Sequence, residues 1–291
     1  MYVRTGGVWV LRQTLSIGDC GVNRSFGSFG SVALSADGKV ALLGRPAREV
    51  DPGHAYVFVR KGGKFVPQPP FTVFVDIDFE QGSPIFSSGG EPGFGRSVAL
   101  SDDGTRMLIG GNDFSGGSAP VYVFKRSGAK WTELQKLTPP TGVTFDPIAL
   151  AADGKTALIG APSSLQAYVF VRRGVHLRLR QILTGPALNG FGRSVSITAD
   201  GRRLLVGAPA GTDAAAAAYV FRESGGIWTL RQTLTPSETE TGFGSSVAIS
   251  SKGGNAALVG SPQPLIFDPD RPEQLPCAEG LPCGAAYAFR K

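Results

Sequence analysis

The chain has 291 residues, of which 42% are apolar and 18% are charged, and its formal net charge is +6 at neutral pH. This length suits one large all-β domain or two ordinary domains, and no apolar run reaches the ~20 residues of a membrane-spanning helix. The 41 glycines and 21 prolines indicate many turns between short elements and argue against a largely helical protein.

The first predicted element is an alternating strand within residues 1–15, MYVRTGGVWVLRQTL. It shows no secretion signal. Residues 6–15, GGVWVLRQTL, match residues 225–234, GGIWTLRQTL, almost letter for letter. The two ends of the chain therefore contain the same kind of strand.

From residue 29 onward the chain repeats one pattern with a period near fifty residues. Each copy opens with Phe-Gly, at residues 29, 94, 191 and 243, and a degenerate Phe-Asp stands at residue 145. An alternating apolar strand, an Asp-Gly or Gly-Gly turn and a second apolar strand follow, which is a strong hairpin signal. A third strand marked by Tyr-x-Phe and, in all but the last copy, a fourth strand complete the unit. Four short antiparallel strands per repeat predict the blades of a β-propeller.

The predicted fold is a single all-β domain over residues 1–291, a propeller of five four-stranded antiparallel blades. We place the blades at about 29–93, 94–144, 145–190, 191–242 and 243–291, with residues 6–15 completing the last blade. Closure by the N-terminal strand would cover strand edges that could pair with other chains. All six tyrosines fall at the third-strand position, and Tyr2 has no blade of its own. Either residues 1–4 lie outside the ring, or the chain is a fragment of a six- or seven-bladed propeller.

The repeat resembles a known family. The Phe-Gly openings, with Gly-Ala-Pro at residues 160–162 and 207–209, are similar to the FG-GAP repeat, which builds the N-terminal propeller of integrin α chains and of many bacterial extracellular proteins. The resemblance covers nearly the whole chain and implies a secreted or cell-surface bacterial module for adhesion or recognition. Its best-known form has seven blades, whereas this chain has five copies.

No cofactor is expected. Calcium-binding FG-GAP members carry alternating Asp and Asn residues in the turn between the first two strands. Here that turn is as short as SADGK, which supplies too few oxygen ligands for a calcium ion. The resemblance therefore implies the fold without the metal, and we assign no metal ligand.

The long, dissimilar loops of the repeats are expected on one face, called the top, and variable loops on a repeated scaffold usually carry the binding function. We expect a non-catalytic monomer that binds a protein or carbohydrate there rather than nucleic acid. The alternative is a glycoside hydrolase or lyase that uses top-face carboxylates. The candidate binding residues are Asp51, Asp76, Asp78, Glu80, Asn112, Asp113, Asp213, Asp268 and Asp270.

The short turns are expected on the opposite, bottom face, where basic residues cluster. Arg60, Lys61, Arg126, Arg172 and Arg173 could attract a polyanion such as an acidic glycan. The simpler interpretation is that the turns need charged residues for solubility.

Other chemistry is sparse. Cys277 and Cys283 are close enough in sequence to form a disulfide within one loop, or they are free thiols. His54 and His176 lie far apart and outside any cluster with metal-ligand spacing, and the chain has no G-x-S-x-G motif. We therefore assign no catalytic residue.

Overall fold

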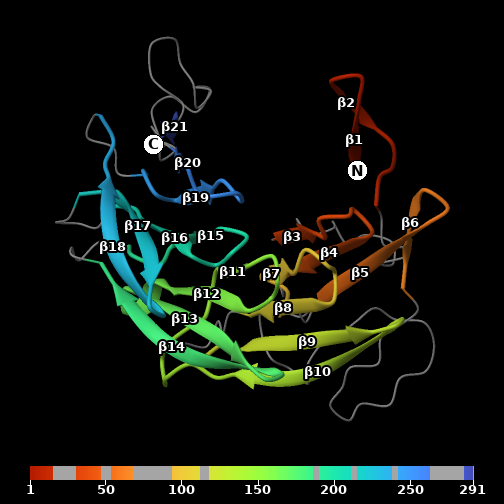
Figure 1. The fold of residues 1–291 in the computed structure, drawn as a ribbon, viewed down its shortest axis with the longest axis horizontal. Coiled ribbons are helices and arrows are strands. Elements are labelled where there is room, and N and C mark those ends of the chain that lie inside the picture. The colour runs from red at the N-terminus through yellow and green to blue at the C-terminus, as the bar shows by residue number, and fades with distance from the viewer. Residues whose placement is uncertain are drawn as a thin grey trace, which may run out of the picture.

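The computed structural model describes residues 1–15, 31–46, 54–68, 94–111, 118–185, 190–210, 215–237, 242–262 and 285–290. Strands dominate these ranges, and their one helical element is a short 3-10 turn, η1 (Pro162–Ser164). Five antiparallel sheets follow one another around a ring as blades (Figure 1). The all-β propeller predicted from the repeat is confirmed.

In every blade the strands pair in chain order. Blade 1 contains β3 (Ser31–Leu34), β4 (Val40–Arg45), β5 (His54–Lys61) and β6 (Lys64–Pro67). Blade 2 contains β7 (Ser97–Leu100), β8 (Arg106–Gly110), β9 (Val121–Ser127) and β10 (Lys130–Leu137). Blade 3 contains β11 (Ile148–Leu150), β12 (Thr156–Ala161), β13 (Gln166–Arg173) and β14 (His176–Thr184). Blade 4 contains β15 (Ser194–Ile197), β16 (Arg203–Ala208), β17 (Ala217–Ser224) and β18 (Ile227–Leu234). The described residues of blade 5 form β19 (Ser246–Ile249), β20 (Ala256–Ser261) and β21 (Ala285–Arg290).

Backbone hydrogen bonds link the turns that follow the first strands of successive blades. The N–H of Ala36 donates to the carbonyl of Asp102 (2.9 Å), and Asp102 donates to Ala152 (2.9 Å). Ala152 donates to Ala199 (3.1 Å), which donates to Ser251 (3.0 Å). These four links connect all five blades by main-chain groups alone, so they depend little on side-chain identity.

Glycine allows neighbouring blades to touch at the backbone. In three blades, the glycine one residue before the end of the second strand faces the Phe-Gly glycine of the next blade, and a Cβ on the first would overlap the carbonyl oxygen of the second. The three pairs are Gly44 with Gly95, Gly160 with Gly192, and Gly207 with Gly244. The second member has a φ between +85° and +92°, a conformation that favours glycine. These glycines therefore have a packing role at the contacts between blades.

The apolar core is divided into layers between blades. One cluster joins residues of blades 1 and 2, and others join blades 2 and 3, 3 and 4, and 4 and 5. The phenylalanine of each described opening is buried and packs on the Tyr-x-Phe aromatics of its own third strand, with ring centroids 4.8–6.3 Å apart. Such edge-on and tilted contacts are typical of stable aromatic packing.

The fourth strands share a buried side chain near their start, which we call the anchor. The anchors of blades 1 to 4 are Phe65, Trp131, Leu177 and Trp228. Three of these anchors are bound by a glutamine, which comes from the fourth strand of the preceding blade or, for blade 1, from the N-terminal segment. The glutamine Nε2 donates to the anchor carbonyl and its Oε1 accepts the anchor N–H, at 2.8–2.9 Å. These pairs are Gln13 with Phe65, Gln135 with Leu177, and Gln181 with Trp228.

The N-terminal strand differs from the prediction. β2 (Val8–Leu11) pairs with β1 (Tyr2–Thr5) in a separate two-stranded sheet and not with β21 of blade 5. Gly6 and Gly7 form a two-residue turn with φ of +59° and +86°, which suits a tight hairpin. This hairpin lies across an opening in the ring from blade 5 (Figure 1). Local pairing with β1, whose sequence is of the third-strand type, therefore replaces the expected pairing with β21.

Candidate functional site

The turns between first and second strands and those between third and fourth strands form one face. This is the predicted bottom face, and we call it the turn face. In the first of these turns the hydroxyl of Ser35 donates to Asp37 Oδ1 (2.8 Å), and the N–H of Lys39 donates to the same oxygen (2.9 Å). These hydrogen bonds, led by the Lys39 N–H, lower the pKa of Asp37 to about 2. Asp103 and Asp200 bind their own turns in the same way. These carboxylates thus stabilise their turns.

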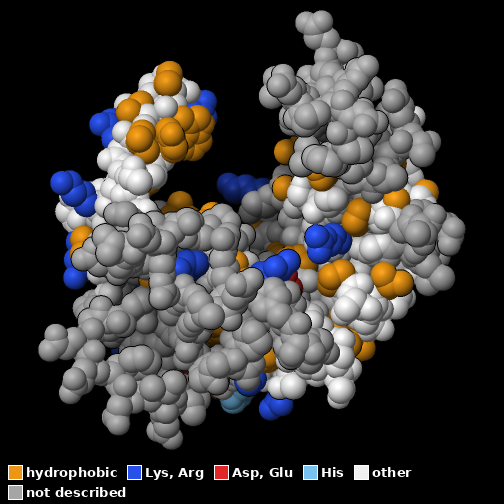
Figure 2. Space-filling model, turned by 180° about the vertical axis from the view of Figure 1, so that it is seen from behind, with side chains coloured by type: hydrophobic (Ala, Val, Ile, Leu, Met, Phe, Trp, Pro, Cys, Tyr) orange, Lys and Arg blue, Asp and Glu red, His pale blue; other side chains and the backbone are white. Residues whose placement is uncertain are grey.

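Charge on the described residues is strongly one-sided. They hold 25 of the 29 basic residues and 8 of the 23 acidic residues, a difference of +17. On the face shown in Figure 2, nearly all described charged side chains are Lys or Arg. The other 4 basic and 15 acidic residues lie outside the described residues, and the whole chain carries a net charge of +6.

The structure places the predicted basic residues at the ends of third strands. Arg60 and Lys61 end β5, and Arg172 and Arg173 end β13. Arg126 lies near the end of β9. Arg60, Lys61 and Arg173 are exposed, whereas Arg126 and Arg172 are half-buried. All five lie on third strands at the turn face, as the repeat predicted.

A further arginine was missed in the sequence. Arg106 begins β8, is 8% exposed, and donates from Nη1 to the carbonyl of Val175 in the next blade (3.3 Å). Burial lowers its pKa, the positive charge of Arg172 lowers it further, and Asp103 acts in the opposite direction. Arg106 and Arg172 thus concentrate positive charge between blades 2 and 3. The apolar run that follows Arg106 indicates a buried strand, but it does not indicate that the arginine at the start of that strand is buried too.

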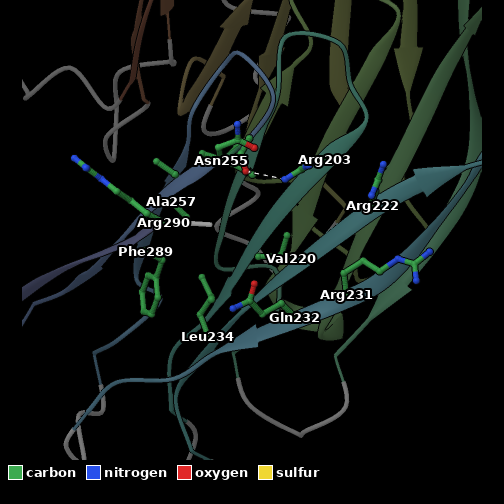
Figure 3. Close-up of a pocket in the computed structure, with 13 residues that line it drawn as sticks. Arg203, Val220, Arg222, Arg231, Gln232, Leu234, Asn255, Ala257, Phe289 and Arg290 are labelled. Carbon is green, nitrogen blue, oxygen red and sulfur yellow. Dashed lines mark hydrogen bonds between the residues drawn. The ribbon is translucent and has the colours of Figure 1, made fainter.

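A cavity of about 470 Å³ lies between blades 4 and 5 (Figure 3). We call it the edge cavity. Its apolar side chains come from both blades and include Leu234 and Phe289. Four arginines and no acidic residue line it, and Arg203 Nη1 donates to the carbonyl of Gly254 (3.0 Å). The lining residues are Arg203, Val220, Arg222, Arg231, Gln232, Leu234, Ile249, Gly254, Asn255, Ala256, Ala257, Phe289 and Arg290.

The sequence contains a signal for the edge cavity. A glutamine recurs four residues after the fourth-strand anchor, at Gln135, Gln181 and Gln232, and at Gln13 near the N-terminus. Gln13, Gln135 and Gln181 each bind the next anchor, whereas Gln232 is exposed beside the cavity. The recurrence predicts a partner for Gln232 that the described residues do not supply.

The predicted top-face residues lie outside the described residues. They are Asp51, Asp76, Asp78, Glu80, Asn112, Asp113, Asp213, Asp268 and Asp270, and the same holds for Cys277 and Cys283. Near that face, the described Asp146 accepts a hydrogen bond from Arg96 Nε at 2.6 Å. This ion pair joins the starts of blades 2 and 3.

No group of three or more His, Cys, Asp or Glu side chains within the described ranges could hold a metal ion. Nor does any helix in those ranges have the length and apolar character of a membrane span. The described part of the chain thus offers basic and apolar surfaces rather than converging acids.

Solved structures share this fold at low sequence identity. Hydrazine synthase from Kuenenia stuttgartiensis has a TM-score of 0.55 at 13% identity, over 94% of this chain and 65% of that chain. The β-propeller domain of Cps50 (Swd1) from Myceliophteria thermophila has a TM-score of 0.51 at 11% identity, over 80% of each chain. A functionally unknown protein from Desulfotomaculum acetoxidans has a TM-score of 0.54 at 13% identity, over 80% of this chain and 65% of that one.

These matches define the class of protein as a β-propeller and carry no function to this chain. This chain spans slightly less than two thirds of the hydrazine synthase chain and of the Desulfotomaculum protein. No protein-family model and no curated protein sequence matches it, so membership of the FG-GAP family stays a prediction.

Proposed function

We propose that this protein is a non-catalytic recognition propeller that binds an acidic polysaccharide through its turn face. The observation that carries the proposal is the cluster of basic side chains at the ends of the third strands, where Arg60, Lys61 and Arg173 are exposed on the turn face. A surface of this kind attracts polyanions over distances set by ionic strength. The resemblance of the repeats to those of bacterial extracellular proteins favours a location outside the cytoplasm.

The arrangement of the basic groups suits an extended polymer. Arg172 and Arg173 of blade 3 lie at one turn, and half-buried Arg126 belongs to the neighbouring blade 2. Guanidinium groups present several N–H donors in one plane, which matches sulfate and carboxylate groups better than a single ammonium does. A chain of anionic sugars could therefore contact successive blades at once.

A non-catalytic role is favoured by the use of the nearby acids. Asp37, Asp103 and Asp200 bind the hydroxyl and backbone groups of their own turns. A glycosidase needs two carboxyl groups about 5 to 9 Å apart at a pocket. The competing proposal is an enzyme with acids in the top loops, such as Asp268 and Asp270. Glycan hydrolysis that disappears in Asp268→Asn would favour it.

The test is retention on heparin as a function of salt. The double variant Arg172→Ser/Arg173→Ser should elute at clearly lower salt and show a shallower salt dependence, since each lost ionic contact reduces the slope. Two single variants provide a matched comparison, because each removes one exposed positive charge. Arg173→Ser removes it from the turn face and Arg193→Ser from the opposite end of the blades. Equal losses in this pair, or no retention of the parent protein at low salt, would refute the proposal.

A further inference from the structure

The interface between blades 3 and 4 shows how a fourth strand is held. The Trp228 side chain is 4% exposed and packs with Val169, Leu183 and Phe221. Its Nε1 donates to the carbonyl of Gly201 at 3.1 Å. Gln181 binds its backbone, as described above. The interface thus recognises an extended strand with a large apolar anchor.

A second contact extends this recognition to the turn before the strand. Arg180 of blade 3 donates from Nε to the carbonyl of Gly226 at 2.9 Å. Gly225 and Gly226 precede the anchor strand in a turn with φ of +62° and +81°. A strand that fits the interface therefore carries two glycines shortly before its anchor.

The edge cavity keeps several of these apolar and polar positions, and no fourth strand lies there in the described residues. Arg203 and Arg222 also line it, where the blade 3 side has Thr156 and Val171. By position in the repeat, Val220, Leu234 and Phe289 correspond to Val169, Leu183 and Phe221, and all three line the cavity. Likewise, Gln232 and Arg231 correspond to Gln181 and Arg180. In the described residues no anchor fills the cavity and no fourth strand pairs with β21. Within the described ranges, the cavity is thus an anchor site without its anchor.

The N-terminal hairpin presents the matching strand. Residues 6–15 are identical to residues 225–234 at eight of ten positions, including both glycines and the tryptophan. Trp9 is 67% exposed, and Tyr2, Val8 and Leu11 are also exposed. Figure 2 shows this hairpin as a protruding apolar lobe. The described part of one chain therefore carries both an exposed anchor strand and an anchor site that no described strand fills.

We propose that β2 of a second copy of this chain adds to the free edge of β21 and places Trp9 in the edge cavity. Gln232 would then bind the Trp9 backbone, and Arg231 the carbonyl of Gly7. By correspondence with β17 and β18, Val10 would lie opposite Arg290. The copies would associate head to tail through two different surfaces.

A second copy is favoured over the same chain by where β2 is held. Gln13 binds blade 1, and Met1 and Leu15 pack on its core, so β2 lies across the opening from its own β21 (Figure 1). Four backbone links and three glycine pairs join successive blades, so bringing β2 to its own β21 would require these contacts to shift. A second copy can keep β2 on its own blade 1 and lose only the four residue pairs to β1. A two-stranded hairpin of that size is marginal in water.

The proposal is tested by cross-linking full-length chains in which Cys20, Cys277 and Cys283 are replaced by Ser. One preparation carries Val10→Cys and the other Arg290→Cys. Under mild oxidation their mixture should form a disulfide-linked dimer, with the linkage between positions 10 and 290 identified by mass spectrometry. The matched control pairs Val10→Cys with Arg222→Cys, the corresponding position of blade 4, whose edge β18 already occupies. That mixture should not cross-link.

Two other outcomes would overturn the proposal. If the double variant Val10→Cys/Arg290→Cys forms the bond only within one chain, the occupant is the chain's own strand. If neither arrangement forms the bond, the site does not accept β2. In light scattering, the parent chain should associate as its concentration rises, and Trp9→Ala should weaken association at least tenfold. Trp9→Phe should largely retain it, because Phe65 is the anchor of blade 1, and unchanged melting of both variants would show that folding is intact.

Discussion

The interfaces on the two sides of blade 4 are built from corresponding residues but differ in one strand. On the side of blade 3, Trp228 is buried and Gln181 is half-buried and paired; on the side of blade 5, a cavity replaces the anchor and Gln232 is exposed. The comparison shows that most of a blade interface forms without the fourth strand. The anchor and its glutamine then join the fourth strands of the two blades. Three pairs of variants test this difference, and a fourth pair compares the turns of blades 1 and 5.

The largest effect is expected for the anchor itself. Trp228→Ala should lower the free energy of unfolding by about 4 kcal/mol, because a large buried aromatic is removed and leaves a cavity. Trp9→Ala in monomeric protein should cost less than about 0.5 kcal/mol, as expected for an exposed residue. Urea denaturation of both variants at low protein concentration measures the difference. Comparable losses would mean that Trp9 is already buried in the monomer.

The next effect concerns contact between backbones. A Cβ at Gly207 would overlap the carbonyl oxygen of Gly244, whereas at the corresponding Gly260 it would overlap only the Ser246 hydroxyl, which can rotate away. Gly207→Ala should therefore cost about 3 kcal/mol, in the upper range for overpacking, and Gly260→Ala about 1 kcal/mol or less. Thermal melting ranks the two variants. The reverse order would show that the fifth blade contacts a neighbour at Gly260.

A smaller effect is expected for the glutamines. Gln181→Ala leaves the N–H and carbonyl of Trp228 without their side-chain partners, and should cost about 1–2 kcal/mol. Gln232→Ala should change stability by less than about 0.5 kcal/mol in the monomer. Chemical denaturation of both proteins provides the comparison, and a Gln232→Ala loss as large as that of Gln181→Ala would contradict an unfilled site.

The smallest effect is in the pH dependence. The pKa of Asp37 is about 2 in the fold, below its ordinary value of 3.8, so its stabilising hydrogen bonds are present above about pH 4 and are lost as the pH falls toward 2. Asp37→Asn should reduce the loss of stability between pH 4 and pH 2. The corresponding turn of blade 5, Lys252-Gly253-Gly254, has no carboxylate, so Lys252→Gln should leave the pH profile unchanged. Urea midpoints measured from pH 5 to pH 2 test both expectations.

The repeat made the fold predictable because the turns and strands of each blade are specified by short-range sequence patterns. Asp-Gly turns and alternating apolar residues define hairpins locally. The partner of β2 was not predictable in this way. β1 and β21 have the same type of sequence, so both match β2, and the two-residue glycine turn joins β2 to the nearer of them. Arg106 and the edge cavity were also missed, because both depend on contacts between residues about fifty or more positions apart.

The backbone links between the turns that follow the first strands bear on how such a molecule can change in evolution. Each link joins a donor in one blade to an acceptor in the next, always in the same direction. A duplicated repeat would bring its own donor and its own acceptor and would find both partners already in place. Gain or loss of a whole blade would therefore need no new kind of backbone link between blades. New contacts would be needed only between the first and last blades, on the two sides of the opening in the ring.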